Sequence, residues 1–394
     1  MYITQNLSLF LAGILIAAST DWAAGGLPAL PQPPKSVTQA ERERDIKVFR
    51  DWWYPCSTPP DVEAVIRIKA WSDTHPEDGE AMFFVWASYR FGLAHDLIEH
   101  KDVKPVDLAA IIKRSAALGY VPARARYAMI LVGSRLVEDS GEAPDIAAGL
   151  KMLEDCIEKG DPDAYFFKGG LLVGGEAGLK RDMPGAERYL DKAIHLGCIR
   201  ALAFLGDIQV NTIDEETGLA TIRKGAEAGD PYAQLLVAKY SFRRARTRKE
   251  LAESFQWLKK SAEGQKVLSE AHAMLADCYF RGKGTDVDHV KAFSSYKVAT
   301  SLGDQRAALE LAKLWLNGDG CTMDIKSGVQ VLNKLTELDY GPAETLLGVL
   351  YLEGLLVPRD PMKAKQLFQA ASRHDDAQAD AYLRLLEAEK PQIN

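Results

Sequence analysis

The sequence predicts an all-α fold, a right-handed superhelical solenoid of about eight helix-turn-helix repeats with an N-terminal helical cap. An alanine recurs every 32 to 42 residues, and these anchor alanines are Ala81, Ala123, Ala164, Ala201, Ala233, Ala271, Ala307, Ala343 and Ala379. A glycine lies eleven residues after five of them, at Gly92, Gly175, Gly282, Gly318 and Gly354. Each interval has room for two short amphipathic helices, and one such pair cannot bury its apolar face without copies of itself.

Residues 271–303 show the repeat most clearly. Small and apolar side chains recur at helical spacing in the first half of this stretch. Gly282 and Gly284 then interrupt the helix, because glycine adopts positive φ angles freely. Asp286 or Asp288 can cap the second helix, which is expected to end at Gly303.

This order of an alanine, a G-x-G loop, a Lys-Ala pair, an aromatic residue and a closing glycine resembles the Sel1-like repeat family of bacteria, a relative of the tetratricopeptide repeats. Residues 271–303 match almost throughout, and residues 307–339 and 343–374 match well. The repeats at Ala164 and Ala201 match in part, and those at Ala81, Ala123 and Ala233 are degenerate. The resemblance implies an architecture rather than an activity, because one fold can serve many functions.

The chain is expected to have five parts. Leu7 to Ala18 is an apolar run too short to span a bilayer and suited to a secretory signal, although the first basic side chain is only Lys35. A retained anchor and a packed helix stay open as alternatives. Thr38 and Glu41 have the spacing of a capping box at the start of a helix. The parts are a signal peptide (1–24), a proline-rich linker (25–37), capping helices (38–80), repeats (81–378) and a C-terminal capping helix with a tail (379–394).

Charge and cysteine content exclude several classes of protein. The formal net charge of −7 argues against a nucleic-acid binder, which usually has a basic face. The cysteines occupy unrelated positions in the repeat, so the chain lacks the cysteine pairs of the disulfide-rich branch of the family. We expect most of them to be buried as small hydrophobic residues, with at least one free thiol. They are Cys56, Cys156, Cys198, Cys278 and Cys321.

No set of residues predicts catalysis, and we expect no cofactor and no metal. His95 and Glu99, like Asp96 and His100, are four residues apart and can share a helix face, but a solvated edge is the favoured interpretation. Ser294 and Lys297 match the Ser-x-x-Lys spacing of penicillin-reactive enzymes. The companion motifs of those enzymes are absent, so this match is attributed to chance. A β-lactamase-like hydrolase on the solenoid is kept as an alternative.

One loop is strongly basic. In the repeat at Ala233 the expected G-x-G is replaced by a cluster of Arg243, Arg244, Arg246, Arg248 and Lys249. The equivalent loop of the preceding repeat is acidic, with Asp214, Glu215 and Glu216. The favoured interpretation is a contact between the two neighbouring loops, and the alternative is a patch that attracts an anionic partner.

Two further groups are candidates for partner binding. Charges of alternating sign occur six residues after four anchors, at Asp207, Lys239, Asp277 and Lys313. They are expected to form a ladder that sets the register of the repeats, or else a strip open to a ligand. Five of the seven tryptophans precede residue 90, including Trp52 and Trp53. They are expected to belong to the cap, with an aromatic contact patch as the alternative.

The function that the resemblance implies is a non-enzymatic scaffold or adaptor of the bacterial envelope that binds another protein. The partner is expected to be an envelope assembly component or a secreted effector, for which this chain would act as an immunity protein, as in type VI lipase systems. A signal peptide would place it in the periplasm, with membrane contact only through an uncleaved N-terminal segment. A cytoplasmic regulatory adaptor is the other alternative.

Overall fold

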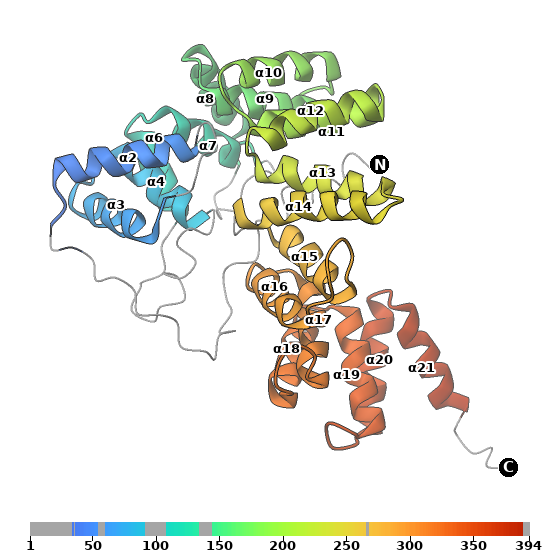
Figure 1. The fold of residues 1–394 in the computed structure, drawn as a ribbon. Helices are drawn as coiled ribbons and strands as arrows, with labels where there is room; N and C mark the ends of the chain where they lie inside the picture. The colour runs from blue at the N-terminus through green and yellow to red at the C-terminus, as the bar shows by residue number, and fades with distance from the viewer. Residues whose placement is uncertain are drawn as a thin grey trace. The chain divides into compact units, whose positions relative to one another are not determined.

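A computed structural model describes residues 34, 36–53, 60–90, 108–133, 144–264 and 268–388. Within these ranges the protein consists of helices and short connections, without a strand (Figure 1). The chain divides into two compact units, one up to Leu268 and one from Ser269 onwards. The predicted all-α architecture is confirmed. Its continuation as a single stack from one unit to the next stays a prediction.

Each unit is a succession of antiparallel helix pairs. The helices of the first unit are α2 (Gln39–Trp53), α3 (Val62–Thr74), α4 (Gly79–Arg90), α6 (Leu108–Ala117), α7 (Val121–Leu131), α8 (Ile146–Glu158), α9 (Pro162–Gly174), α10 (Met183–His195), α11 (Arg200–Thr212), α12 (Glu215–Glu227), α13 (Pro231–Arg244) and α14 (Arg248–Gly264). Those of the second are α15 (Ser269–Arg281), α16 (His289–Ser301), α17 (Gln305–Asn317), α18 (Ile325–Glu337), α19 (Gly341–Glu353), α20 (Pro361–Arg373) and α21 (Ala377–Ala388). Within each unit every helix packs on the next one along the chain, most extensively inside the pairs that the repeat predicts, such as α11 with α12 and α15 with α16.

The anchor alanines lie where the helices pack most closely. All nine have 0% of their surface exposed. Eight lie near the start of the first helix of a pair, and Ala379 lies near the start of α21. A larger side chain there would have to displace a neighbouring helix, because protein interiors are close-packed. The spacing that predicts the repeats therefore also identifies their most buried positions.

The loop glycines have the backbone geometry that the sequence predicts. Gly175, Gly282, Gly318 and Gly354 have φ angles between +65° and +77°, and each directly follows a first helix. This left-handed conformation is open to glycine at little cost and ends a helix with its last carbonyls satisfied. Gly92 lies outside the described residues, as do His95, Asp96, Glu99 and His100.

Aspartate begins most of the described helices. At eleven of them an aspartate side chain accepts a hydrogen bond from the backbone N–H three residues later, which satisfies one of the free donors of the first turn. Asp288, not Asp286, caps α16, and its carboxylate accepts a hydrogen bond of 2.9 Å from the backbone N–H of Lys291. Much of the acidic excess of this chain therefore serves local helix capping.

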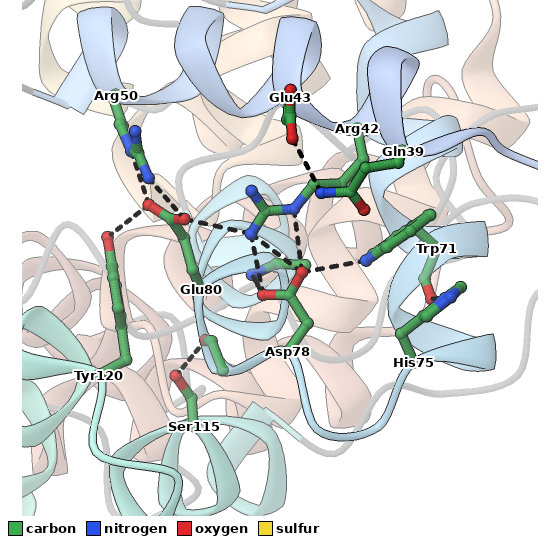
Figure 2. A network of polar contacts seen from close by, with 12 residues as sticks. Gln39, Arg42, Glu43, Arg50, Trp71, His75, Asp78, Glu80, Ser115 and Tyr120 are labelled. Carbon is green, nitrogen blue, oxygen red and sulfur yellow. Dashed lines mark hydrogen bonds and ion pairs between the residues drawn. The ribbon is translucent and has the colours of Figure 1, made fainter.

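A polar network joins the N-terminal cap to the first repeat (Figure 2). Arg42 of α2 bonds both oxygens of Asp78, at 2.9 and 3.1 Å, and Trp71 of α3 donates to the same carboxylate at 3.0 Å. Glu80 of α4 accepts from Arg42 and Arg50. Because these side chains come from three helices, they fix α2 and α3 against α4. Helices α2 and α3 lie where the N-terminal cap is predicted, and the bounds of the cap stay a prediction.

The cap also begins as predicted. The backbone N–H of Thr38 donates to Glu41 at 2.8 Å, and the N–H of Glu41 donates to the Thr38 hydroxyl at 3.3 Å, which is a capping box. No helix within the described ranges is long and apolar enough to cross a membrane. The predicted signal peptide and most of the linker lie outside the described residues.

Three of the five cysteines are buried as expected. Cys156, Cys198 and Cys278 are buried free thiols, and Cys321 is a partly buried one. Burial raises the pKa of the Cys156 thiol to about 11, which keeps it protonated and unreactive. Cys56 lies outside the described residues.

Candidate partner-binding site

The hairpin of α13 and α14 has an unusually short connection. Only residues 245–247 separate the two helices, whereas residues 282–288 separate α15 from α16. No glycine ends α13. Ala245 follows it with an extended backbone, φ −55° and ψ 128°, so the chain turns at once into α14. The cations of this segment are therefore held on two helix ends rather than on a long loop.

The cations at the two helix ends differ in how they lie relative to the helix dipole. Arg243 and Arg244 lie in the last turn of α13, where positive charge is favourable. Arg248 and Lys249 are the first two residues of α14, at the positive end of its dipole, where cations are disfavoured. Glu250 offsets part of this effect, since it closes a capping box with Thr247. Helix stability does not explain the cations at the start of α14.

The predicted contact between the basic and acidic loops is confirmed. Arg243 lies 2.6 Å from a carboxylate oxygen of Glu215 at the start of α12, and Arg244 lies 3.4 Å from the same oxygen. The guanidinium of Arg243 also stacks over the Tyr240 ring at 4.8 Å. Both arginines are more than half exposed, so these pairs contribute little to stability. Two of the five cations thus have an intramolecular partner.

The other three cations form what we call the basic edge, which consists of Arg246, Arg248 and Lys249. All three side chains are exposed. Within the described ranges Arg246 and Arg248 form no side-chain ion pair. Lys249 approaches Glu253 only at 4.0 Å, with 87% of its own side chain exposed. The basic edge can therefore take an anionic group without first breaking a strong internal contact.

The charged strip behaves differently in the two units. In the first unit the carboxylate of Asp207 accepts a hydrogen bond from the Tyr240 hydroxyl at 3.3 Å, from α13 to α11. Burial raises the pKa of Asp207, while this bond and nearby Lys239 lower it. The contact joins two successive repeats, which fits the predicted register role.

In the second unit the predicted partners are wrong. Asp277 accepts from the Tyr296 hydroxyl and pairs with Arg306 of the next repeat at 3.0 Å. Lys313 instead donates to Glu310 of its own helix at 2.8 Å. Arg306 lies at the start of α17, closer along the chain to α15 than Lys313, and its Nη1 atom reaches one oxygen of the carboxylate. Spacing alone does not reveal such a competitor.

Trp52 and Trp53 are not surface residues, and the contact-patch interpretation is wrong for them. They are 5% and 4% exposed. The Trp53 indole donates to Asp163 of α9 at 3.1 Å, and Arg200 stacks over its ring at 4.8 Å. Both side chains pack inside the cap and the first repeats, because burying a large aromatic ring removes much apolar surface from water.

Ser294 and Lys297 show no catalytic arrangement. The Ser294 hydroxyl donates to the Lys291 carbonyl at 2.9 Å, within its own helix. Both Ser294 and Lys297 are exposed on α16. A serine nucleophile needs a base within hydrogen-bond reach, and the hydroxyl here points to the backbone instead.

Comparison with known proteins adds to this geometry. The model of the Sel1 repeat matches residues 162–198, 231–265, 269–304 and 341–376, which are the pairs α9–α10, α13–α14, α15–α16 and α19–α20. Four helix pairs of this chain thus match the Sel1 repeat. One of them is the pair at Ala233, which carries the basic edge. This repeat was expected to be degenerate, but it matches the Sel1 model. The pairs at Ala201 and Ala307 fold alike, but their assignment as Sel1 repeats stays a prediction.

The chain is also similar to curated proteins and to solved structures. NMB1327, an uncharacterized protein of Neisseria meningitidis serogroup B, is 25% identical over 237 residues, 59% of this chain and 47% of that protein. The chain thus spans about half the length of this curated relative. The structure of c5321, a protective antigen of uropathogenic Escherichia coli with an SLR fold, is similar with a TM-score of 0.55, 19% identity and coverage of 83% of this chain and 68% of that one. A Sel1 repeat protein from Oxalobacter formigenes is similar with a TM-score of 0.48, 21% identity and coverage of 63% and 96%.

Proposed function

We propose that this chain is a non-enzymatic scaffold whose basic edge binds an acidic segment of a partner protein. Sel1 repeats are a scaffold typical of protein–protein interaction. The observation that carries the proposal is the placement of Arg248 and Lys249 on the first turn of α14, exposed and against the helix dipole. An anionic partner would meet these two cations, Arg246 and the positive end of α14 together.

The test is capture of a partner by a triple charge reversal, Arg246→Glu, Arg248→Glu and Lys249→Glu. We expect the variant to retain less than about a tenth of the protein partner that the natural chain captures from an extract, because three attractive contacts become repulsive. Its melting temperature should be unchanged or slightly higher, since carboxylates at the start of α14 favour the helix by about 0.3–1 kcal/mol each.

A matched control reverses three other exposed cations of the first unit, Lys151, Arg188 and Arg223. This control changes the net charge by the same amount and should capture the partner normally. Equal loss in both variants would show that only net charge matters. A large fall in melting temperature with unchanged capture would show that the basic edge is structural.

We place the protein in the bacterial envelope as part of this proposal. Its support is the apolar run from Leu7 to Ala18, which suits a secretory signal. N-terminal sequencing of the expressed protein tests this placement. A start at or beyond Ser19 supports export, whereas an unprocessed start favours the cytoplasmic regulatory adaptor.

A narrower form of the proposal is an immunity protein that neutralises a secreted, lipase-like effector. It rests on the resemblance to Sel1-like proteins alone. A gene for such an effector beside the gene of this chain, and stoichiometric inhibition of its lipase activity by the purified chain, would support it. Full lipase activity in the presence of excess chain would remove it.

The hydrolase alternative has no structural observation in its favour. Ser294→Ala combined with Lys297→Ala should abolish any β-lactam turnover if these residues carry it. Turnover that is unchanged in this variant, or absent from the natural chain, excludes them.

A further inference from the structure

One junction of the second unit brings two carboxylates and a histidine together. Four residues before an anchor alanine, five repeats have a glycine, at Gly119, Gly160, Gly197, Gly229 and Gly303. The junction before Ala343 has Asp339 there, with a φ angle of +56°, and the junction before Ala379 has Asp375, with a φ angle of +59°. This left-handed angle is uncommon for any residue other than glycine.

Two further residues lie close to Asp339. Glu344 directly follows its anchor alanine, a position that is apolar in some repeats and polar or charged in others. Glu344 is only 3% exposed, and burying an ionised carboxylate is costly without a charged or polar partner. His374 ends α20, where α16 and α18 end in leucine.

The side chains of Asp339, Glu344 and His374 lie close together. A carboxylate oxygen of Glu344 lies within hydrogen-bond distance of Nδ1 of His374, at 2.8 Å. A carboxylate oxygen of Asp339 lies 3.8 Å from Nε2 of the same ring. One ligand atom from each residue lies within 4.8 Å of the others. Two ligands of a tetrahedral zinc ion, each about 2.1 Å from it, lie about 3.4 Å apart, so the widest pair needs to close by up to roughly 1.4 Å to hold an ion.

We propose that Asp339, Glu344 and His374 bind a divalent transition-metal ion of the zinc class. One imidazole nitrogen with two carboxylate oxygens suits zinc, whereas calcium and magnesium prefer oxygen ligands alone. A three-residue set leaves at least one coordination position open to water or to a group from a partner.

The ion would act as a clamp inside the second unit. Asp339 lies in the turn between α18 and α19, Glu344 in the first turn of α19, and His374 at the end of α20. One ion would therefore tie the junction between two repeats to the end of the following helix. This inference is independent of the basic edge, which belongs to the first unit, and either can fail without the other.

Isothermal titration of the full chain, without a histidine tag, with zinc chloride tests the site. We expect one ion per chain with a dissociation constant in the micromolar range or tighter. We also expect the melting temperature to rise by about 3 °C or more at about 100 µM zinc. His374→Gln and Asp339→Asn should each weaken binding at least tenfold. Asp339 is 79% exposed, so its replacement should not disturb folding.

Two control variants come from equivalent positions. Asp375 has the same left-handed backbone, with a φ angle of +59°, one repeat later and is not part of the cluster. His289 lies 4.0 Å from Asp319 but without a buried glutamate. Asp375→Asn and His289→Gln should bind zinc like the natural chain. Absence of zinc binding, or equal losses in the control variants and in His374→Gln, would overturn the proposal.

Discussion

The pKa of an aspartate that caps a helix is raised in one part of this chain and lowered in others. At the exposed caps Asp214, Asp288 and Asp324, hydrogen bonds to the carboxylate lower its pKa. At the buried cap Asp161 burial dominates, helped by the neighbouring Asp163 carboxylate, and raises the pKa to about 7. The same capping interaction therefore gives stability that depends on pH in opposite directions.

The cap at Asp161 should lose stability as pH rises. Its pKa is higher in the folded than in the unfolded chain, so its contribution is full below about pH 4 and is lost as pH rises through about 7. Asparagine keeps the cap but carries no charge. We expect Asp161→Asn to gain on the order of 2 kcal/mol relative to the natural chain between pH 5 and pH 8. Thermal unfolding at both pH values measures this difference.

Asp214→Asn is the matched control for that experiment. The pKa of Asp214 is lower in the folded chain, so its contribution is present above the unfolded value of 3.8 and is lost only as pH falls below it. This variant should not change the slope between pH 5 and pH 8. A parallel course for Asp161→Asn and the natural chain would contradict the assigned pKa.

At the scale of the element, the short connections between helices are the feature that most shapes the candidate site. Only Ile213 and Asp214 separate α11 from α12, so these two helices approach each other closely. Gly206 and Gly218 face each other where they cross. A Cβ atom on Gly206 would lie 2.5 Å from the Ile222 side chain and 2.7 Å from the Gly218 carbonyl oxygen.

Gly206→Ala should therefore destabilise the first unit, although alanine favours helices over glycine. We expect a loss of about 1–3 kcal/mol in the free energy of unfolding, because the backbone of α12 has to move. Chemical denaturation measures it. Gly264→Ala is the control, since the closest atom to its Cβ atom would be in the Pro231 ring, at 3.3 Å. Equal stability of the two variants would show that the crossing is looser than described.

The sequence predicts this part of the structure well where a single residue decides the outcome. The alanines and loop glycines predict the helix pairs, because only small residues fit the crossings and only glycine takes the left-handed turn readily. The polar partners could not be predicted in the same way. Asp277 has several cations within one repeat length, and Arg306 binds it because of side-chain reach rather than spacing.

The candidate sites show the same difference. The basic edge is visible in the sequence because its three cations lie within four residues of the chain. Asp339, Glu344 and His374 form no sequence motif, and a metal site was not expected. The equivalent positions of the next repeat are also acidic, at Asp375 and Asp380, so spacing alone does not single these residues out. Trp52 and Trp53 were open to two interpretations because sequence does not tell which side of α2 faces the repeats.

At the scale of the whole molecule, the chain is a series of helix pairs whose stability is local and whose exposed features differ from repeat to repeat. In such a scaffold each pair contacts mainly its neighbours, so individual loops can change without loss of the fold. The α13–α14 pair has kept the helices and the anchor alanine while its loop has become short and basic. This freedom is how one repeat can become specialised for a partner.

The affinity for the captured partner at two salt concentrations tests the central claim most directly. For the natural chain we expect the dissociation constant to rise at least tenfold between about 50 mM and about 300 mM salt, because screening weakens attraction between exposed charges. The Arg246→Glu, Arg248→Glu and Lys249→Glu variant should bind weakly at both concentrations. An affinity that is equal for both chains and insensitive to salt would contradict a role of the basic edge in binding.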